Sequence, residues 1–257
     1  MPSIRKRSNL EEGGLNSNRN ILAAFLLLPP SLRPWLGIAF VLGTSRGLLM
    51  AVGEYARLRS VHPEMARKTL HVGMGGIFLA YPWLFSSPWP TWVLAGIYVS
   101  LLMARVYFVP LQYRVAGVIY GVERRSYGEF YFPLSASLLF SLSRGDLLLY
   151  TIPFSLLVFA DAAAAIIGTR YGSFHFQTPG GRKSVEGSLA FIAIGFLTTH
   201  VILILGGHVR PEVSLISACM IAMASAVVEA ICWNGFDNIA VPLMAFELLR
   251  VLGAMQT

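Results

Sequence analysis

Apolar segments of roughly the length that crosses a lipid bilayer recur along most of this 257-residue chain. A transmembrane helix needs about 17–25 mostly apolar residues. The pattern predicts helices near residues 35–53, 70–87, 90–109, 130–142, 147–168, 186–206, 213–232 and 238–254. The composition agrees, since 55% of the residues are hydrophobic and only 13% are charged, which is too apolar for an ordinary soluble domain. We expect an all-α, polytopic integral membrane bundle with about seven or eight transmembrane helices.

The N-terminal segment differs from the rest of the chain. Residues 1–20 are polar and predict a disordered tail, so residues 21–257 are expected to form a single transmembrane domain. Residues 21–31 are apolar but short. The sequence leaves open whether they cross the membrane, and therefore on which side the N-terminus lies.

Basic residues predict the orientation of the bundle. When the loops are assigned alternately to two sides, one side carries only Arg144 and Arg210. The other side carries Arg57, Arg59, Arg67, Lys68, Arg114, Arg124, Arg125, Arg170, Arg182 and Lys183. Loops rich in Lys and Arg face the cytoplasm, which places this second side there. Basic residues in short loops, rather than on one exposed patch, also argue against a nucleic-acid partner.

Asp161 is the polar residue that stands out most within the apolar segments. It is followed by Ala162–Ala165, small residues that let neighbouring helices approach closely. An ionisable residue inside a membrane segment is costly and indicates a functional site. A carboxylate is also the type of ligand by which proteins hold Mg²⁺ beside substrate phosphates. We therefore expect Asp161 to be catalytic and to bind a divalent metal, although a structural ion pair is the alternative.

A glycine-rich basic loop follows Asp161 on the same predicted side. It reads Gly180-Gly181-Arg182-Lys183-Ser184-Val185-Glu186-Gly187. Glycines let the backbone approach an anion, and Lys183 supplies a positive charge. Ser184 is a typical N-cap for the next helix, whose free N–H groups would face the loop. The loop predicts a phosphate-binding site, and the alternative is a basic loop that only caps a helix.

Further polar residues are expected on this side of the membrane. Arg67 and His71 lie four residues apart and share one helical face, where they and Lys68 could reach a phosphate. The additional candidates are Arg124, Arg125, Glu229, Asp237 and Asn238. Glu229 and Asp237-Asn238 could add a second acidic ligand or bind sugar hydroxyls, and helix capping is the alternative. We expect Asp161, Lys183 and His71 to line one pocket with an apolar opening for a lipid chain. The pattern suits phosphoryl or nucleotidyl transfer, which depends on positioning and electrostatics.

These motifs resemble those of the CTP-dependent polyprenol and lipid kinases: dolichol kinase, phytol kinase and the CTP-dependent diacylglycerol kinase, relatives of the phosphatidate cytidylyltransferases. The shared motifs are Arg67-Lys68-x-x-His71, Asp161-Ala162 with Gly168-x-x-x-Gly172, Lys183-Ser184-Val185-Glu186-Gly187-Ser188, and Val228-Glu229-Ala230 before Asp237-Asn238 and Val241-Pro242.

The resemblance implies an integral membrane enzyme that transfers the γ-phosphate of CTP to a lipid hydroxyl. Mg²⁺ or another divalent metal would assist at a site on the cytoplasmic face. Asp161 then matches the acidic residue of the family, and Lys183 and Glu186 match its nucleotide-loop residues. Glu186 is expected to be catalytic and to share the metal with Asp161. The lipid alcohol could be dolichol, phytol, another polyprenol or diacylglycerol, and the oligomeric state stays open.

Two other functions compete with this interpretation. A phosphatidate cytidylyltransferase would use the same residues to make a CDP-lipid. A transporter of an anionic solute would need a polar path across the whole bilayer and inverted repeats, and the sequence shows neither feature.

Overall fold

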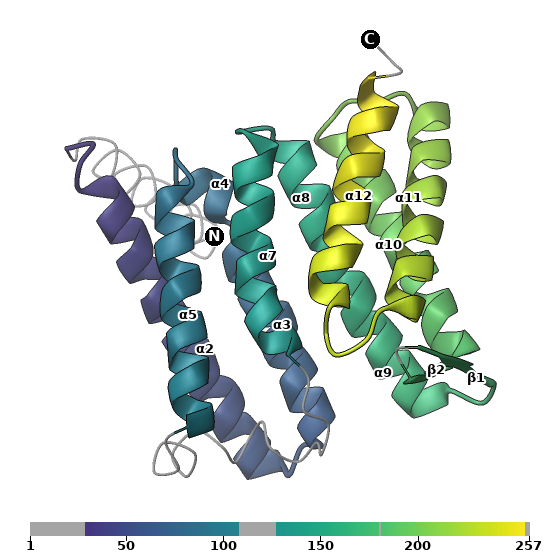
Figure 1. Ribbon diagram of the computed structural model, residues 1–257, viewed down its shortest axis with the longest axis horizontal. Helices are drawn as coiled ribbons and strands as arrows, with labels where there is room; N and C mark the ends of the chain where they lie inside the picture. The colour runs from purple at the N-terminus through teal and green to yellow at the C-terminus, as the bar shows by residue number, and fades with distance from the viewer. Residues whose placement is uncertain (1–28, 108–126, 180, 255–257) are drawn as a thin grey trace, which may run out of the picture.

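The computed structural model describes residues 29–107, 127–179 and 181–254. Within them the chain forms a bundle of helices and one small hairpin (Figure 1). The expected tail, Arg124, Arg125 and Gly180 lie outside the described residues. The helices are α2 (Arg33–Arg59), α3 (Pro63–Leu79), α4 (Tyr81–Leu84), α5 (Trp89–Tyr107), α7 (Gly128–Ser143), α8 (Leu147–Ser155), the π-helix η1 (Leu156–Ala160), α9 (Asp161–Tyr171), α10 (Val185–Leu205), α11 (Pro211–Ile231) and α12 (Asp237–Ala254).

The predicted all-α membrane class is confirmed. Among the described residues, four helical segments are long and apolar enough to cross a membrane: α2, the continuous run α8–η1–α9, α10 and α11. The total of seven or eight crossings stays a prediction, because the remaining described helices are shorter or carry more charge. The described strands, β1 (His175–Thr178) and β2 (Gly181–Ser184), pair antiparallel within the segment expected to be a loop.

The second helix begins earlier than expected. The apolar pattern predicts a helix over 70–87, but α3 runs from Pro63 to Leu79. Proline is favoured in the first helical turn, and the His62 side chain accepts a hydrogen bond from the backbone N–H of Glu64. Hydropathy detects the apolar part of a helix rather than its polar first turns. As a result, α3 contains the whole motif from Arg67 to His71.

The segment α8–η1–α9 lies between two apolar cores. Leu157 and Val158 pack in one core with Phe78 from α3 and residues of α7. Leu156 and Ala160 pack in the other core with residues of α10, α11 and α12. Burying apolar side chains on both sides fixes the position of this segment. Asp161, the next residue, therefore follows directly on the segment where the two cores adjoin.

Candidate functional site

A pocket of about 1160 Å³ is lined in part by residues of the β1–β2 hairpin, which lies at one end of the bundle (Figure 1). Residues from α3, α7, α9, β2, α10, α11 and α12 line it, so it joins segments that are distant in the sequence. The expectation that Asp161, Lys183 and His71 line one pocket is confirmed. Other expected site residues that line it are Arg67, Lys68, Arg182, Ser184, Gly187, Glu229, Asp237 and Asn238.

Asp161 is paired with a buried lysine. Lys68 Nζ donates a hydrogen bond to Asp161 Oδ2 at 2.6 Å, and the exposed fractions of the two side chains are 4% and 13%. Lys68 was expected to bind phosphate, and the structure instead places its ammonium group on Asp161. A π-helix, η1, ends directly before Asp161, and short π-helical segments are frequent at functional sites. This pair compensates the charge of Asp161 in the protein interior.

His71 and Arg67 are held by neighbours on the same side of the pocket. His71 Nε2 lies 2.9 Å from the carbonyl oxygen of Leu157. A carbonyl can only accept, so Nε2 carries a proton. The same Nε2 is 3.5 Å from Asp161 Oδ2. Arg67 donates two hydrogen bonds to Glu64, at 2.6 and 2.9 Å. The helix thus presents Arg67 and His71 in fixed orientations, as their spacing of four residues predicts.

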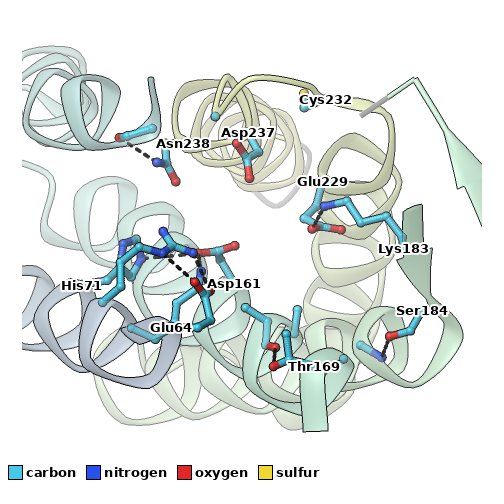
Figure 2. A pocket seen from close by; sticks show the side chains of 18 of the residues that line it. Glu64, His71, Asp161, Thr169, Lys183, Ser184, Glu229, Cys232, Asp237 and Asn238 are labelled. Atoms are coloured by element: carbon cyan, nitrogen blue, oxygen red, sulfur yellow. Dashed lines mark hydrogen bonds and ion pairs between the residues drawn. The ribbon is translucent and has the colours of Figure 1, made fainter. Parts of the chain in front are cut away.

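Three carboxylates from different helices meet in the pocket. One carboxylate oxygen from each of Asp161, Glu229 and Asp237 lies within 4.8 Å of the other two, and Figure 2 shows these side chains pointing into the same space. Lys183 donates a hydrogen bond to Glu229 and forms an ion pair with it. Burial, together with the negative charge of Asp161, raises the pKa of Asp237 to about 6. Carboxylate oxygens crowded in this way are the donor type that suits Mg²⁺, so these three residues fit a divalent metal.

Glu186 is absent from this cluster. Among the described residues, Ser184, Gly187 and Ser188 line the pocket but Glu186 does not. Its Oε1 instead accepts hydrogen bonds from the backbone N–H groups of Ser173 and Phe174. The structure therefore does not bring Glu186 to Asp161 as a shared metal ligand, and Glu229 and Asp237 occupy that position. The physical reason is that β2 ends at Ser184 and α10 begins at Val185. Glu186 therefore lies on the helix and its side chain takes a different direction from that of Lys183 on the strand.

Ser184 caps α10, as the sequence predicts. Its Oγ accepts a hydrogen bond from the backbone N–H of Gly187 at 3.1 Å. The start of α10 packs closely on α9, because a Cβ added at Gly168 would lie 2.8 Å from Ser184 Oγ. The lack of a side chain at Gly168 therefore lets the capped end of α10 approach α9, the helix that carries Asp161. Gly181, also expected to bind phosphate, begins β2 with a φ of 115° and does not line the pocket.

Replacing Gly187 by Ala should destabilise the protein. The new Cβ would lie 2.9 Å from both the Ala164 carbonyl oxygen and Ser184 Oγ, and 3.2 Å from Gly168 Cα. Two of these neighbours are backbone, so α9 must shift, at a cost of about 1–3 kcal/mol. Gly76→Ala is the matched control, since nothing lies within 4 Å of its Cβ. Thermal unfolding in detergent should show a lower Tm for Gly187→Ala alone, and equal Tm values would contradict the close packing.

The loop between α11 and α12 is fastened to the start of α7. Asn238 Nδ2 donates a hydrogen bond to the Gly128 carbonyl oxygen at 2.8 Å, and the Tyr127 N–H donates one to the Asn234 carbonyl oxygen at 3.1 Å. Asn238 therefore fixes the end of α12 that carries Asp237.

Several residues that line the pocket were not predicted from the sequence, among them Glu64, Glu129, Cys232, Trp233 and Asn234. For Glu64, the available signal was its spacing of three residues from Arg67.

Comparison with known proteins relates the chain to a curated enzyme. Over 220 residues the chain is 31% identical to a phytol kinase from Synechocystis sp., and the match covers 84% of this chain and 91% of that protein. No family model matches the chain, and no solved structure matches it.

Proposed function

The chain belongs to the phytol kinase family, and we propose that it transfers the γ-phosphate of CTP to the hydroxyl of a lipid alcohol. Phytol, dolichol, other polyprenols and diacylglycerol are the candidate substrates. In this reaction the lipid oxygen forms a bond to the γ-phosphorus, and the bond from that phosphorus to the β–γ bridging oxygen breaks. CDP leaves and the hydroxyl proton is released. The observation that carries the proposal is the pocket in which Asp161, Glu229 and Asp237 meet beside Lys68 and Lys183.

The charge of the pocket supports metal assistance. Its lining contains the carboxylates of Glu64, Glu129, Asp161, Glu229 and Asp237, against the cations of Arg67, Lys68, Arg182 and Lys183. Among the described residues that line the pocket, carboxylates thus outnumber Lys and Arg by five to four, and this part of the site offers no net positive charge to a triphosphate. A divalent cation held by Asp161, Glu229 and Asp237 would supply the missing positive charge and neutralise the phosphate oxygens. Magnesium is the best candidate because all three ligands are carboxylates.

Some residues of the pocket would bind the phosphates, and others would hold the metal ligands in place. Lys183 and Arg182, on β2, would contact the phosphates, and Lys183 is already directed into the pocket by Glu229. Lys68 would hold Asp161 in place through their ion pair. Phosphoryl transfer requires mainly such positioning and electrostatic stabilisation, which these residues would supply.

A donor and product assay tests the proposal. The purified protein would be incubated with a panel of lipid alcohols, with CTP or ATP, and with Mg²⁺ or a chelator. We expect a lipid monophosphate and CDP, faster turnover with CTP than with ATP, and no turnover with the chelator. Conversion of phosphatidate to a CDP-lipid with release of pyrophosphate would support the cytidylyltransferase alternative instead. Activity that is equal with and without the chelator would contradict the metal-assisted site.

The site is proposed to face the cytoplasm, and cysteine labelling tests this side. Ser173 and Arg210 are exposed and lie before and after α10. Single cysteines would be placed at these positions after Cys219 and Cys232 are replaced by alanine. A membrane-impermeant reagent added to intact cells should label the Arg210 position and leave the Ser173 position protected, because the Lys- and Arg-rich side faces inward. The reverse labelling would overturn the orientation.

A further inference from the structure

Glu186 links the residues that precede β1 to the residues that follow β2. Its Oε1 accepts hydrogen bonds from the backbone N–H of Ser173 at 3.0 Å and of Phe174 at 3.1 Å. In the opposite direction, the Val185 N–H donates to the Phe174 carbonyl oxygen at 2.8 Å. Residues 173–174 are thereby joined to residues 185–186 by three hydrogen bonds. Hydrogen bonds to a charged acceptor are stronger than neutral ones.

These bonds lie at the open end of the hairpin. Strand β1 begins at His175, directly after the bonded residues, and β2 ends at Ser184, directly before them. In the register of the pair, His175 is opposite Ser184 and Phe176 is opposite Lys183. An isolated two-stranded hairpin is marginally stable at best. The contacts of Glu186 therefore stabilise the hairpin at the end nearest Lys183.

The location of Glu186 separates it from the metal-ligand candidates. Within the described part of the chain, Glu186 neither lines the pocket nor belongs to the cluster of Asp161, Glu229 and Asp237. Its second oxygen, Oε2, is enclosed and has no hydrogen-bond partner there. The bonds that the side chain does make all go to backbone N–H groups, for which a neutral amide oxygen is also an acceptor.

We propose that Glu186 is a positioning residue, which fixes the hairpin and so holds Arg182 and Lys183 at the pocket, and that it is not a metal ligand. The effect on catalysis rests on the proposed function, because Arg182 and Lys183 matter there as phosphate contacts. The effect on the hairpin does not depend on any activity. The two effects can be measured separately.

Two substitutions distinguish a backbone acceptor from a metal ligand. Glu186→Gln keeps an oxygen in the place of Oε1 but removes the charge, whereas Glu186→Ala removes the acceptor. Glu212→Ala is the matched control. Glu212 occupies the second position of α11, the position that Glu186 occupies in α10, and its side chain is exposed. All three variants would be purified in the same detergent as the unaltered protein.

Hydrogen exchange gives the readout that needs no activity. The amides of Ser173 and Phe174 should exchange at least about tenfold faster in Glu186→Ala. In Glu186→Gln and in Glu212→Ala they should stay within about threefold of the unaltered protein. Unchanged exchange in Glu186→Ala would overturn the proposed contact.

Kinetics then test the consequence for the site. Glu186→Ala should raise the KM for CTP by about tenfold or more with a smaller change in the KM for lipid, and Glu186→Gln should restore most of the loss. The Mg²⁺ concentration that gives half-maximal activity should be the same in Glu186→Gln as in the unaltered protein. A Glu186→Gln variant that is inactive, or that needs much more Mg²⁺, would make Glu186 a metal ligand and refute the proposal. If the unaltered protein fails to use CTP, the proposed function fails, while the exchange result still decides the role of Glu186 in the hairpin.

Discussion

Replacing Asp161 by Asn is expected to lower the rate of lipid phosphorylation by about two orders of magnitude or more. The substitution keeps the shape of the side chain but removes its charge. That charge holds Lys68 at 2.6 Å and belongs to the three carboxylates that fit a divalent metal. The measurement is kcat at saturating CTP and lipid. Asp146→Asn is a matched control, because Asp146 caps α8 away from this pocket and Asn is an equally good N-cap.

The same substitution should also affect stability, and this effect has to be separated from catalysis. Lys68 is only 4% exposed, and an ion pair broken on one side in the interior costs about 3–5 kcal/mol. The double variant Lys68→Met with Asp161→Asn removes both charges and should recover much of the lost Tm without recovering activity. Near-normal turnover in Asp161→Asn would show that the carboxylate is structural only.

Replacing Lys183 by Ala should raise the KM for CTP by about 10- to 100-fold, which is the loss expected for a hydrogen bond to a charged group. The KM for lipid should change little, since the ammonium group lies in the pocket on the Glu229 carboxylate and not on an apolar surface. Lys183→Arg should restore binding only in part, because a planar guanidinium differs from a compact ammonium. Arg210→Ala, between α10 and α11, is the control. An effect confined to the lipid saturation curve would contradict the phosphate role.

Much of the fold could be predicted because bilayer-length apolar segments leave little choice of structure. The expected ranges near 186–206 and 213–232 differ by one or two residues from α10 and α11. The start of α3 could not be found in this way, since its first turns are polar and its signals are Pro63 and the cap at His62. The hairpin was also missed, because short polar strands carry no clear periodic pattern.

The sequence predicted which residues line the candidate site better than it predicted which of them contact one another. Asp161, Lys183 and His71 share one pocket as expected, because each stands out as a charged or polar residue beside an apolar segment. The partners could not be read from spacing, since Lys68 and Asp161 are 93 residues apart and Lys183 and Glu229 are 46 apart. The resemblance to the lipid kinases favoured Glu186 as the second metal ligand, with Glu229 and Asp237 as additional candidates. Packing of α11 and α12 instead brings Glu229 and Asp237 to Asp161.

The most direct measurement is the fate of radioactive phosphate from CTP labelled either at the γ-position or at the α-position. A kinase that acts on a lipid alcohol must transfer the γ-label to the lipid and leave the α-label in CDP. We predict this result with the unaltered protein and its loss in Asp161→Asn. Transfer of the α-label to the lipid, with the γ-label released in pyrophosphate, would contradict the account and identify a nucleotidyl transferase.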